Sequence, residues 1–542
     1  MRQPCDEAVI RSGNSIARCQ VKSAPWILAA AILGSSMAFI DSTVVNVALP
    51  ALQLSLHATV VDVQWVVESY GLVLSALILV GGALSDLVGR RLIFVLGTSL
   101  FALASLGCGI SSTISQLIIS RAVQGVGAAA MVPSSLAIIS ASFGEADRGR
   151  AIGTWSGFTA ITTALGPVLG GWLIERASWH WAFLINIPLA AAVIAISLLH
   201  IPETRRSQAG RVDRSGAVAA IVSLAGLVYG FLESATLGWA NPRVYGSLFL
   251  GFAALFSFVL IEKRSSDPMM PLDLFSSRNF SGANLLTLFL YAALGIFFFL
   301  FPLNLIQVQH YSAIATGAAS TPLILLMFFL SRWSGGLVSR FGPRLPLIVG
   351  PLVAAAGFLS FARPAIGGGY WTNFFPAFLI LGLGLAVTVA PLTTVVMSSV
   401  EGQRAGVASG INNAIARVAG VLAIAVLGVA MEQAFGRRLQ MLLTQLQLDP
   451  SVLKSLQSNL VKLGGLQPPP GLGAAATSQI QADIADAFVF GFRWIMFVCA
   501  TLAVASAWTA FRMIPAVASA RAQGVGSSDK PVDPIRRSTA AS

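Results

Sequence analysis

A series of long apolar runs, recurring from residue 27 to residue 511, is the feature that most constrains how this chain folds. A helix of about 20 apolar residues crosses the bilayer core, and within it the helix satisfies its own backbone hydrogen bonds. The sequence therefore predicts an all-α integral membrane protein with fourteen spans, or with twelve if one pair of runs is re-entrant. The runs are 27–49, 64–84, 92–111, 116–140, 151–174, 181–200, 215–233, 244–261, 282–305, 317–338, 345–362, 373–397, 407–430 and 489–511.

Composition supports a membrane protein and excludes two other classes. Charged residues make up only 10% of the 542 residues and hydrophobic residues 56%, whereas a soluble domain carries about 25% charged residues. This excludes an ordinary cytosolic enzyme, and the hydrophobicity excludes a disordered chain. The net charge of +12 comes from Lys and Arg scattered over short loops. That pattern is typical of cytoplasmic loops, so no nucleic-acid partner is expected.

The basic residues are distributed unevenly over the two sides of the membrane. An even number of spans places both termini on one side, where the short loops carry fourteen Lys or Arg, against three on the other. Cytoplasmic loops are enriched in Lys and Arg, so we expect a multi-pass protein of the plasma (inner) membrane with both termini cytoplasmic. The fourteen are Arg90, Arg91, Arg148, Arg150, Arg205, Arg206, Arg211, Arg214, Lys263, Arg264, Arg278, Arg340, Arg344 and Arg404, and the three are Arg176, Arg243 and Arg363.

An internal repeat divides the chain into two halves. GGALSDLVGRR (81–91) is similar to SGGLVSRFGPR (334–344), and DRGRAIG (147–153) is similar to QRAGVASG (403–410). Duplicated six-helix halves with a substrate site between them are typical of secondary transporters. The repeat predicts two six-helix bundles and two helices inserted between them. The expected parts are a cytoplasmic tail at 1–25, bundles at 26–200 and 280–512, inserted helices and linkers at 201–279, an outer loop at 432–488 and a cytoplasmic tail at 513–542. The outer loop contains LQPPPGLG and is either a partly helical hairpin followed by a Pro/Gly linker or disordered.

The loop after the second run combines small, acidic and basic residues. Glycine lets helices approach and permits a tight exit from a helix, and an acid beside two arginines can hold one side of the protein closed. The spacing resembles the signature loop of the major facilitator superfamily, GxxxDxxGRR, although Leu87 stands where that family usually has a basic residue. This resemblance implies a conformational latch made of Gly82, Asp86, Gly89, Arg90 and Arg91.

Two charged residues lie inside apolar runs, Asp41 in the first and Arg121 in the fourth. A charge in mid-membrane costs about 2.5–3.5 kcal/mol on insertion scales, so each needs a partner or water. A buried carboxyl can also titrate in the working range. The run RAVQGVGAA, with Gln124, resembles the superfamily's proton-coupling motif, and FIDSTVVNVALP (39–50) resembles the first-helix signature of the fourteen-span (EmrB/QacA-type) drug/proton antiporters. These resemblances imply that Asp41 and Arg121 couple transport to protons.

The fifth run contains a Gly-Pro-x-x-Gly-Gly sequence. Proline removes a backbone donor and the glycines allow close helix packing. In this position the sequence resembles the motif of the superfamily's exporters, although Thr162 replaces one of its glycines. The resemblance implies export and points to Gly153, Gly166, Pro167, Gly170 and Gly171.

Other residues are candidates by type alone. Glu68 either faces a substrate cavity and attracts cations or lies inert at the membrane interface. Tyr70, Gln124, Trp155 and Asn304 either line such a cavity or pack in the core. The sequence contains no G-x-x-x-x-G-K-[ST], HExxH or G-x-S-x-G motif, and its four histidines are far apart. We therefore expect no metal, no cofactor and no enzymatic activity.

The antiporter resemblance covers roughly residues 25–430 and the last span, with His180 and Glu68 as departures. It implies the major facilitator fold and proton-driven export of amphipathic organic compounds, often lipophilic cations. The alternative is a dedicated exporter of one endogenous metabolite, siderophore or lipid-like compound. The expected partners are small-molecule substrate, protons and the bilayer, with a periplasmic adaptor protein as a further candidate.

Overall fold

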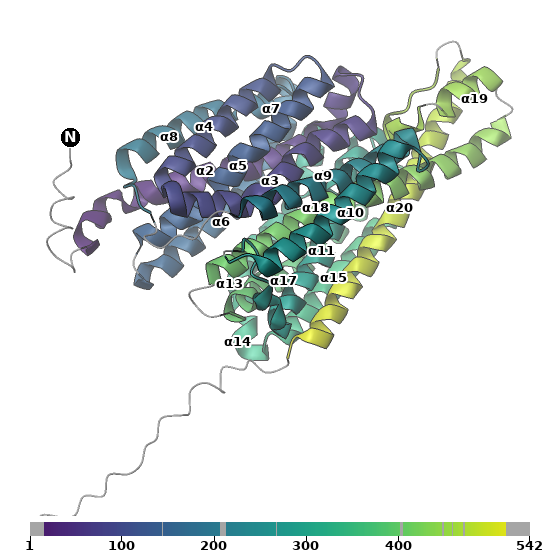
Figure 1. Ribbon diagram of the computed structural model, residues 1–542. Coiled ribbons are helices and arrows are strands. Elements are labelled where there is room, and N and C mark those ends of the chain that lie inside the picture. The colour runs from purple at the N-terminus through teal and green to yellow at the C-terminus, as the bar shows by residue number, and fades with distance from the viewer. Residues whose placement is uncertain are drawn as a thin grey trace, which may run out of the picture.

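A computed structural model describes residues 16–143, 145–205, 213–266, 268–400, 405–446, 449–457, 459–469 and 472–515. These residues form helices and no β-strand. Figure 1 shows two helix bundles, one from each half of the chain, that meet near a helical hairpin carrying α19. Residues 1–15 and 516–542 of the predicted tails lie outside the described part, as do Arg206, Arg211 and Arg404.

The N-terminal half supplies the first bundle, in which the helices pack mainly on one another. Its first helix begins at Ile16, so part of the stretch predicted as a tail is helical. The helices are α2 (Ile16–Ser55), α3 (Val60–Val88), α4 (Arg90–Gly109), α5 (Ile114–Ser142), α6 (Glu145–Arg176), α7 (Trp181–Leu184) and α8 (Asn186–His200).

The C-terminal half supplies the second bundle, whose centre is a set of phenylalanines from three helices. The rings of Phe297, Phe361 and Phe378 lie with their centroids 4.7–6.2 Å apart. The elements are η1 (Leu272–Ser276), α11 (Arg278–Leu303), η2 (Asn304–Val308), α12 (Ala313–Ala319), α13 (Thr321–Gly335), α14 (Leu337–Phe341), α15 (Arg344–Phe361), α16 (Tyr370–Asn373), α17 (Phe375–Ser398), α18 (Ala405–Leu443), η4 (Thr444–Leu446), α19 (Pro450–Gln457), η5 (Leu460–Gly465) and α20 (Ala474–Met513).

The predicted spans are found as helices. Within the described residues, thirteen helical segments are long and apolar enough to cross a membrane, and they cover thirteen of the predicted runs. The remaining run, 151–174, lies in α6, a continuous helix of 32 residues and therefore about 48 Å long. The short runs 181–200 and 345–362 are both helical, which supports fourteen spans over twelve.

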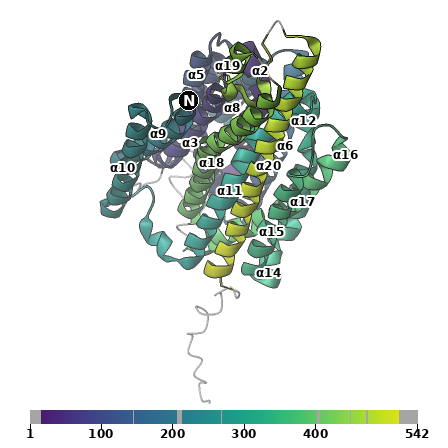
Figure 2. The same cartoon turned by 90° about the vertical axis from the view of Figure 1, so that its right-hand side faces the viewer.

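The inserted helices α9 (Arg214–Leu237) and α10 (Pro242–Arg264) lie at one edge of the molecule (Figure 2). They pack on each other where Gly226 approaches Gly251. The indole of Trp65 on α3 donates to the Glu233 carboxylate on α9 at 3.1 Å. This interaction fixes α9 beside the first bundle, while the apolar outer face of α10 is exposed.

The predicted outer loop 432–488 is largely a helical hairpin. Helices α18 and α20 both extend past the predicted membrane runs, and the Arg438–Asp486 ion pair, at 2.8 Å, joins the two arms. Phe435 and Leu439 of α18 are buried in one apolar cluster with Ile484 and Phe488 of α20. The hydropathy window that finds membrane spans does not detect these outer turns of α18 and α20. Their apolar residues occupy only one face of each helix, so the mean hydropathy of the window is low.

The two halves are joined at the hairpin end. On α6, Gly171 packs against the Ala313 carbonyl of α12, and Pro167 packs against Gly317. The backbone N–H of Ile314 donates to the Glu175 carboxylate at 2.8 Å, which lowers the pKa of Glu175. Nearby, Gln307 of η2 donates to Gln53 of α2 at 2.8 Å. The hairpin end is therefore the closed end of the interface between the halves.

Substituting Gly317→Val should open that end. The added side chain would meet the Pro167 carbonyl, and overpacking costs about 1–3 kcal/mol. With Gln53→Cys as a reporter in a chain without its native cysteines, we expect maleimide labelling of the purified protein to be about fivefold faster or more. Gly246→Val is the control, because a Cβ there meets no atom within 4 Å. Equal labelling rates in the two variants would contradict the assignment of the closed end.

Candidate functional site

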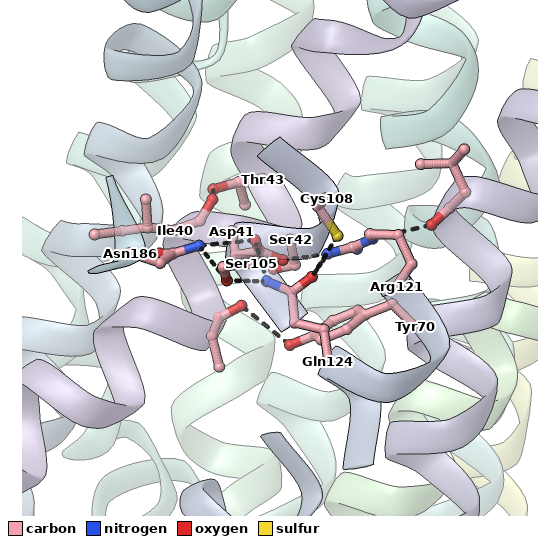
Figure 3. A network of polar contacts seen from close by, with 12 residues as sticks. Ile40, Asp41, Ser42, Thr43, Tyr70, Ser105, Cys108, Arg121, Gln124 and Asn186 are labelled. Carbon is pink, nitrogen blue, oxygen red and sulfur yellow. Dashed lines mark hydrogen bonds and ion pairs between the residues drawn. The ribbon is translucent and has the colours of Figure 1, made fainter. Parts of the chain in front are cut away.

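An ion pair lies at the centre of the first bundle (Figure 3). Arg121 on α5 donates through Nη1 to Oδ2 of Asp41 on α2 at 2.5 Å. The two side chains are 1% and 0% exposed. Asp41 and Arg121, the two charged residues predicted to lie in mid-membrane, thus form an ion pair with each other.

Three neutral side chains complete the network around the carboxylate. Gln124 donates to Asp41 Oδ1 at 2.8 Å and accepts from Arg121 at 2.6 Å. Asn186, at the start of α8, donates to the same Oδ1 at 3.1 Å, and Ser105 on α4 accepts from both amides. Asp41 is therefore connected to three other helices of its half.

The guanidinium is held from its other side by α3. Its Nε donates to the Val66 carbonyl at 3.1 Å, and the Tyr70 ring lies 4.2 Å from its central carbon. Gly125 allows this arrangement, because a Cβ there would come within 2.8 Å of the Tyr70 carbonyl. The sequence RAVQG thus places the cation, its amide partner and the close helix contact within adjacent turns of α5.

The Gly-Pro-x-x-Gly-Gly segment of α6 contacts both halves. Gly166 and Gly170 face α2, where their Cβ positions would meet Thr43 and Val44, two and three residues beyond Asp41. Pro167 and Gly171 face α12 of the other half, as described above. Gly153 lies nearer the start of the same helix. The segment thus connects the stretch of α2 that carries Asp41 with the closed end of the interface.

The predicted latch residues lie together at the opposite end of the bundle. Arg90 pairs with Asp86 at 2.8 Å, and Gly82 lies over Pro133. Gly89 has φ +143°, a conformation that side chains avoid. In this conformation these residues bond to described residues of their own half.

The five cavity candidates are buried or half-buried in this conformation. Glu68, Tyr70, Gln124 and Asn304 are buried, and Trp155 is half-buried with its indole donating to Ser35 at 3.1 Å. Tyr70 and Gln124 belong to the Asp41–Arg121 network. Asn304 begins the π-helical turn η2. Neither carboxylate oxygen of Glu68 has a hydrogen-bond partner among the described residues.

Sequence reasoning missed several residues of these clusters. Asn186 and Ser105 are polar residues inside apolar runs, which was the available signal. Glu203 accepts from the backbone N–H groups of Arg91 and Leu92 at 3.1 and 3.0 Å, capping α4 beside the latch. Arg417 lies in the interior of α18, with its guanidinium 5.8 Å from the Phe39 ring of the other half.

Two pseudo-repeated helix bundles, closed at one end and holding a buried ion pair, define a membrane transporter of the secondary type. A profile of the Major Facilitator Superfamily matches residues 31–424, and the chain belongs to this family.

Curated relatives extend over most of the chain. A tetracenomycin C resistance and export protein from Streptomyces glaucescens is 35% identical, with 77% of this chain and 78% of the relative covered. The multidrug resistance protein Stp from Mycobacterium tuberculosis is 36% identical, with 73% and 74% covered.

A solved structure supports the fold. It is that of a bacterial homologue of the human lysosomal transporter Spinster in an inward-facing, unoccupied conformation, and it superimposes with a TM-score of 0.61 at 17% identity. The superposition covers 90% of this chain and 98% of the other. The predicted family and fold class are confirmed.

Substituting Arg121→Met should destabilise the protein strongly. Removing one partner of a buried ion pair costs about 3–5 kcal/mol, since the other charge stays buried and unpaired. We expect the double variant Asp41→Asn/Arg121→Met to recover part of that loss, as no unpaired charge remains.

Denaturant unfolding of purified protein in micelles measures the free energy of unfolding of both variants. Arg363→Met, at an exposed site, should change the free energy of unfolding by less than about 0.5 kcal/mol. Equal losses in the single and double variants would contradict the pairing.

Proposed function

We propose that this chain is a drug efflux transporter that exports amphipathic organic compounds in exchange for protons. The family and the two relatives named for resistance or export support this proposal. The observation that carries it furthest is the buried Asp41–Arg121 pair and its physical connection through α6 to the interface between the halves.

The mechanism starts with the proton on Asp41. While the carboxylate is charged, Arg121 and Gln124 hold it against α5. A proton removes the charge and weakens the charge-assisted hydrogen bond from Arg121. The stretch of α2 around Asp41 is then free to move, and Gly166 and Gly170 lie directly against that stretch.

Movement of α2 reaches the other half through α6. Pro167 and Gly171 contact α12 at the closed end, so the position of α6 decides whether the halves meet there. The two bundles then rock and expose a central site on alternate sides of the membrane. Asp41 takes up a proton from outside while the hairpin end is open, which releases substrate there. It gives the proton up to the cytoplasm after that end has closed, so one proton enters for the substrate that leaves.

The proton gradient supplies enough energy for this cycle. One charge crossing about 100 mV provides roughly 2.3 kcal/mol, which corresponds to about 50-fold accumulation of substrate. The cycle needs no cofactor, no metal and no covalent step in the substrate. Transport, and not catalysis, is therefore the proposed activity.

We place the protein in the plasma (inner) membrane with both termini in the cytoplasm and the α19 hairpin outside. The excess of Lys and Arg in the loops at the latch end supports this orientation. It makes the closed hairpin end the outer one. A periplasmic adaptor, if one is used, would meet the transporter at the hairpin.

The second candidate function is export of one endogenous metabolite, siderophore or lipid-like compound. A relative named for export of one compound, tetracenomycin C, supports it. Susceptibility tests with unrelated dyes and antibiotics separate the two functions. Resistance to several chemically unrelated compounds supports drug efflux, and resistance to none of them supports the dedicated exporter.

Ethidium efflux from cells that express the chain tests the transport cycle. We expect efflux that stops when a protonophore collapses the proton gradient, because the gradient is the only proposed energy source. Fluorescence of preloaded cells, with and without the protonophore, measures this. Efflux that continues at the same rate with the protonophore would contradict proton coupling.

Asp41→Asn tests the proposed coupling residue. The amide keeps the shape of the carboxyl but carries no titrating proton, so we expect proton-driven ethidium accumulation in inverted membrane vesicles to fall at least about tenfold. Glu233→Gln is the matched control, since Glu233 is a carboxylate of α9 bonded to Trp65 outside the network. Unchanged proton-driven accumulation in Asp41→Asn would remove Asp41 from the mechanism.

A further inference from the structure

A cavity of about 330 Å³ lies at the latch end of the second bundle, away from the coupling network. The starts of α11 and α15 and the end of α20 enclose it, and Arg278, Arg344 and Arg512 line it. None of the described residues that line it is acidic. Three positive charges thus share one cavity without a carboxylate among its described walls.

The corresponding place in the first bundle is neutral. Arg91, which aligns with Arg344 in the internal repeat, donates to the Ile201 carbonyl at 3.0 Å and lies beside Glu203. Glu203 also caps the start of α4 through two backbone N–H groups. Asp86 pairs with the remaining arginine, Arg90. Two carboxylates therefore balance two guanidinium groups.

The second half has lost both carboxylates. Ser339 stands at the position of Asp86 in the repeat. Ile201-Pro202-Glu203, after the last helix of the first bundle, corresponds to Ile514-Pro515-Ala516 after the last helix of the second. Ala516 lies outside the described residues, and its side chain cannot supply an acid. The cavity is thus found where the first bundle places its capping carboxylate.

Arg344, which lacks a carboxylate like the Glu203 beside Arg91, leaves one of its hydrogen-bond donors unpaired among the described residues. Arg344 donates through Nη2 to the Phe511 carbonyl at 2.6 Å and lies 4.6 Å from the Phe511 ring. Its Nε is buried and has no hydrogen-bond partner among the described residues. Buried polar groups are almost always bonded. The unpaired donor and the start of α15, which has no side-chain cap, both fit a missing anion.

The surroundings of the cavity fit a lipid better than a free ion. It lies where three helices long and apolar enough to span a membrane begin or end, and the ends of spanning helices reach the polar surface of the bilayer. Large apolar side chains close by are exposed, including Leu345, Trp508 and Phe511. Acyl chains of a bilayer lipid would cover these side chains, while its headgroup phosphate meets the arginines.

We propose that this cavity binds the phosphate of an anionic phospholipid. Arginine guanidinium groups bind phosphate oxygens through charge-assisted, often bidentate hydrogen bonds. The lipid phosphate takes the role that Glu203 has in the first bundle and supports the start of α15. The proposal concerns the fold of the second bundle and does not depend on proton coupling.

Binding of phosphatidylglycerol to the purified full-length chain tests the proposal. Native mass spectrometry in a neutral detergent measures the affinity, with phosphatidylcholine and inorganic phosphate as the other ligands. For Arg278→Gln and for Arg512→Gln we expect an affinity for phosphatidylglycerol about tenfold lower than that of the unmodified chain. Arg344 is left intact, since it also bonds the Phe511 carbonyl.

Arg340→Gln is the matched control, because Arg340 lies on α14 at the same end of the protein and does not line the cavity. Retained affinity in both test variants, or an equal loss in Arg340→Gln, would overturn the site. If inorganic phosphate binds with the same arginine dependence and phosphatidylglycerol adds nothing, the lipid is overturned as the source of the phosphate.

Ala516→Glu tests the correspondence between the halves. A glutamate there should supply the carboxylate of the first bundle, so we expect it to lower phosphatidylglycerol affinity about tenfold. The thermal stability of the variant without lipid should be retained or increased. Unchanged lipid binding in folded Ala516→Glu protein would overturn the assignment.

Discussion

The rest of the structure depends on one electrostatic constraint, a carboxylate and a guanidinium that are both removed from water. Asp41 and Arg121 offset each other's charge, and Gln124, Asn186 and Ser105 satisfy their remaining hydrogen bonds. Truncating either partner leaves a buried charge, so the pair constrains how four helices of the first bundle pack. The same constraint makes the bundle sensitive to a single proton, because protonation changes the one interaction on which that packing depends.

Much of the fold could be predicted from the sequence, because a bilayer imposes a length and polarity on every span. The two bundles and the inserted pair are predicted from the apolar runs and the repeat, and the family from the resemblance of the motifs that contain Asp41, Asp86 and Arg121. For the segment beyond the membrane the sequence left two interpretations open, a partly helical hairpin or a disordered loop, and the structure shows the hairpin. Its helices are stabilised by the packing of Phe435 and Phe488 within one cluster, a tertiary contact with no signal of its own in local hydropathy.

The site was predictable to a similar extent. Asp41, Arg121 and Gln124 are identifiable because polar groups in apolar runs require partners. Which helices supply those partners depends on packing, so Asn186 and Ser105 were missed. Burial also decides what Tyr70 does, since its ring lies over the Arg121 guanidinium. The close contact between α3 and α5 that places the ring there depends on Gly125.

The complete burial of Asp41 has a consequence for the cell. A titrating group that is accessible from both faces of the membrane at once would let protons leak across. The proton gradient would then dissipate without transport of substrate. In this conformation the carboxylate has no solvent-accessible surface, so a proton can reach or leave it only when the helices around it shift. A transporter that carries no substrate would then leak few protons and leave the proton gradient intact. Each proton that crosses would accompany a conformational change.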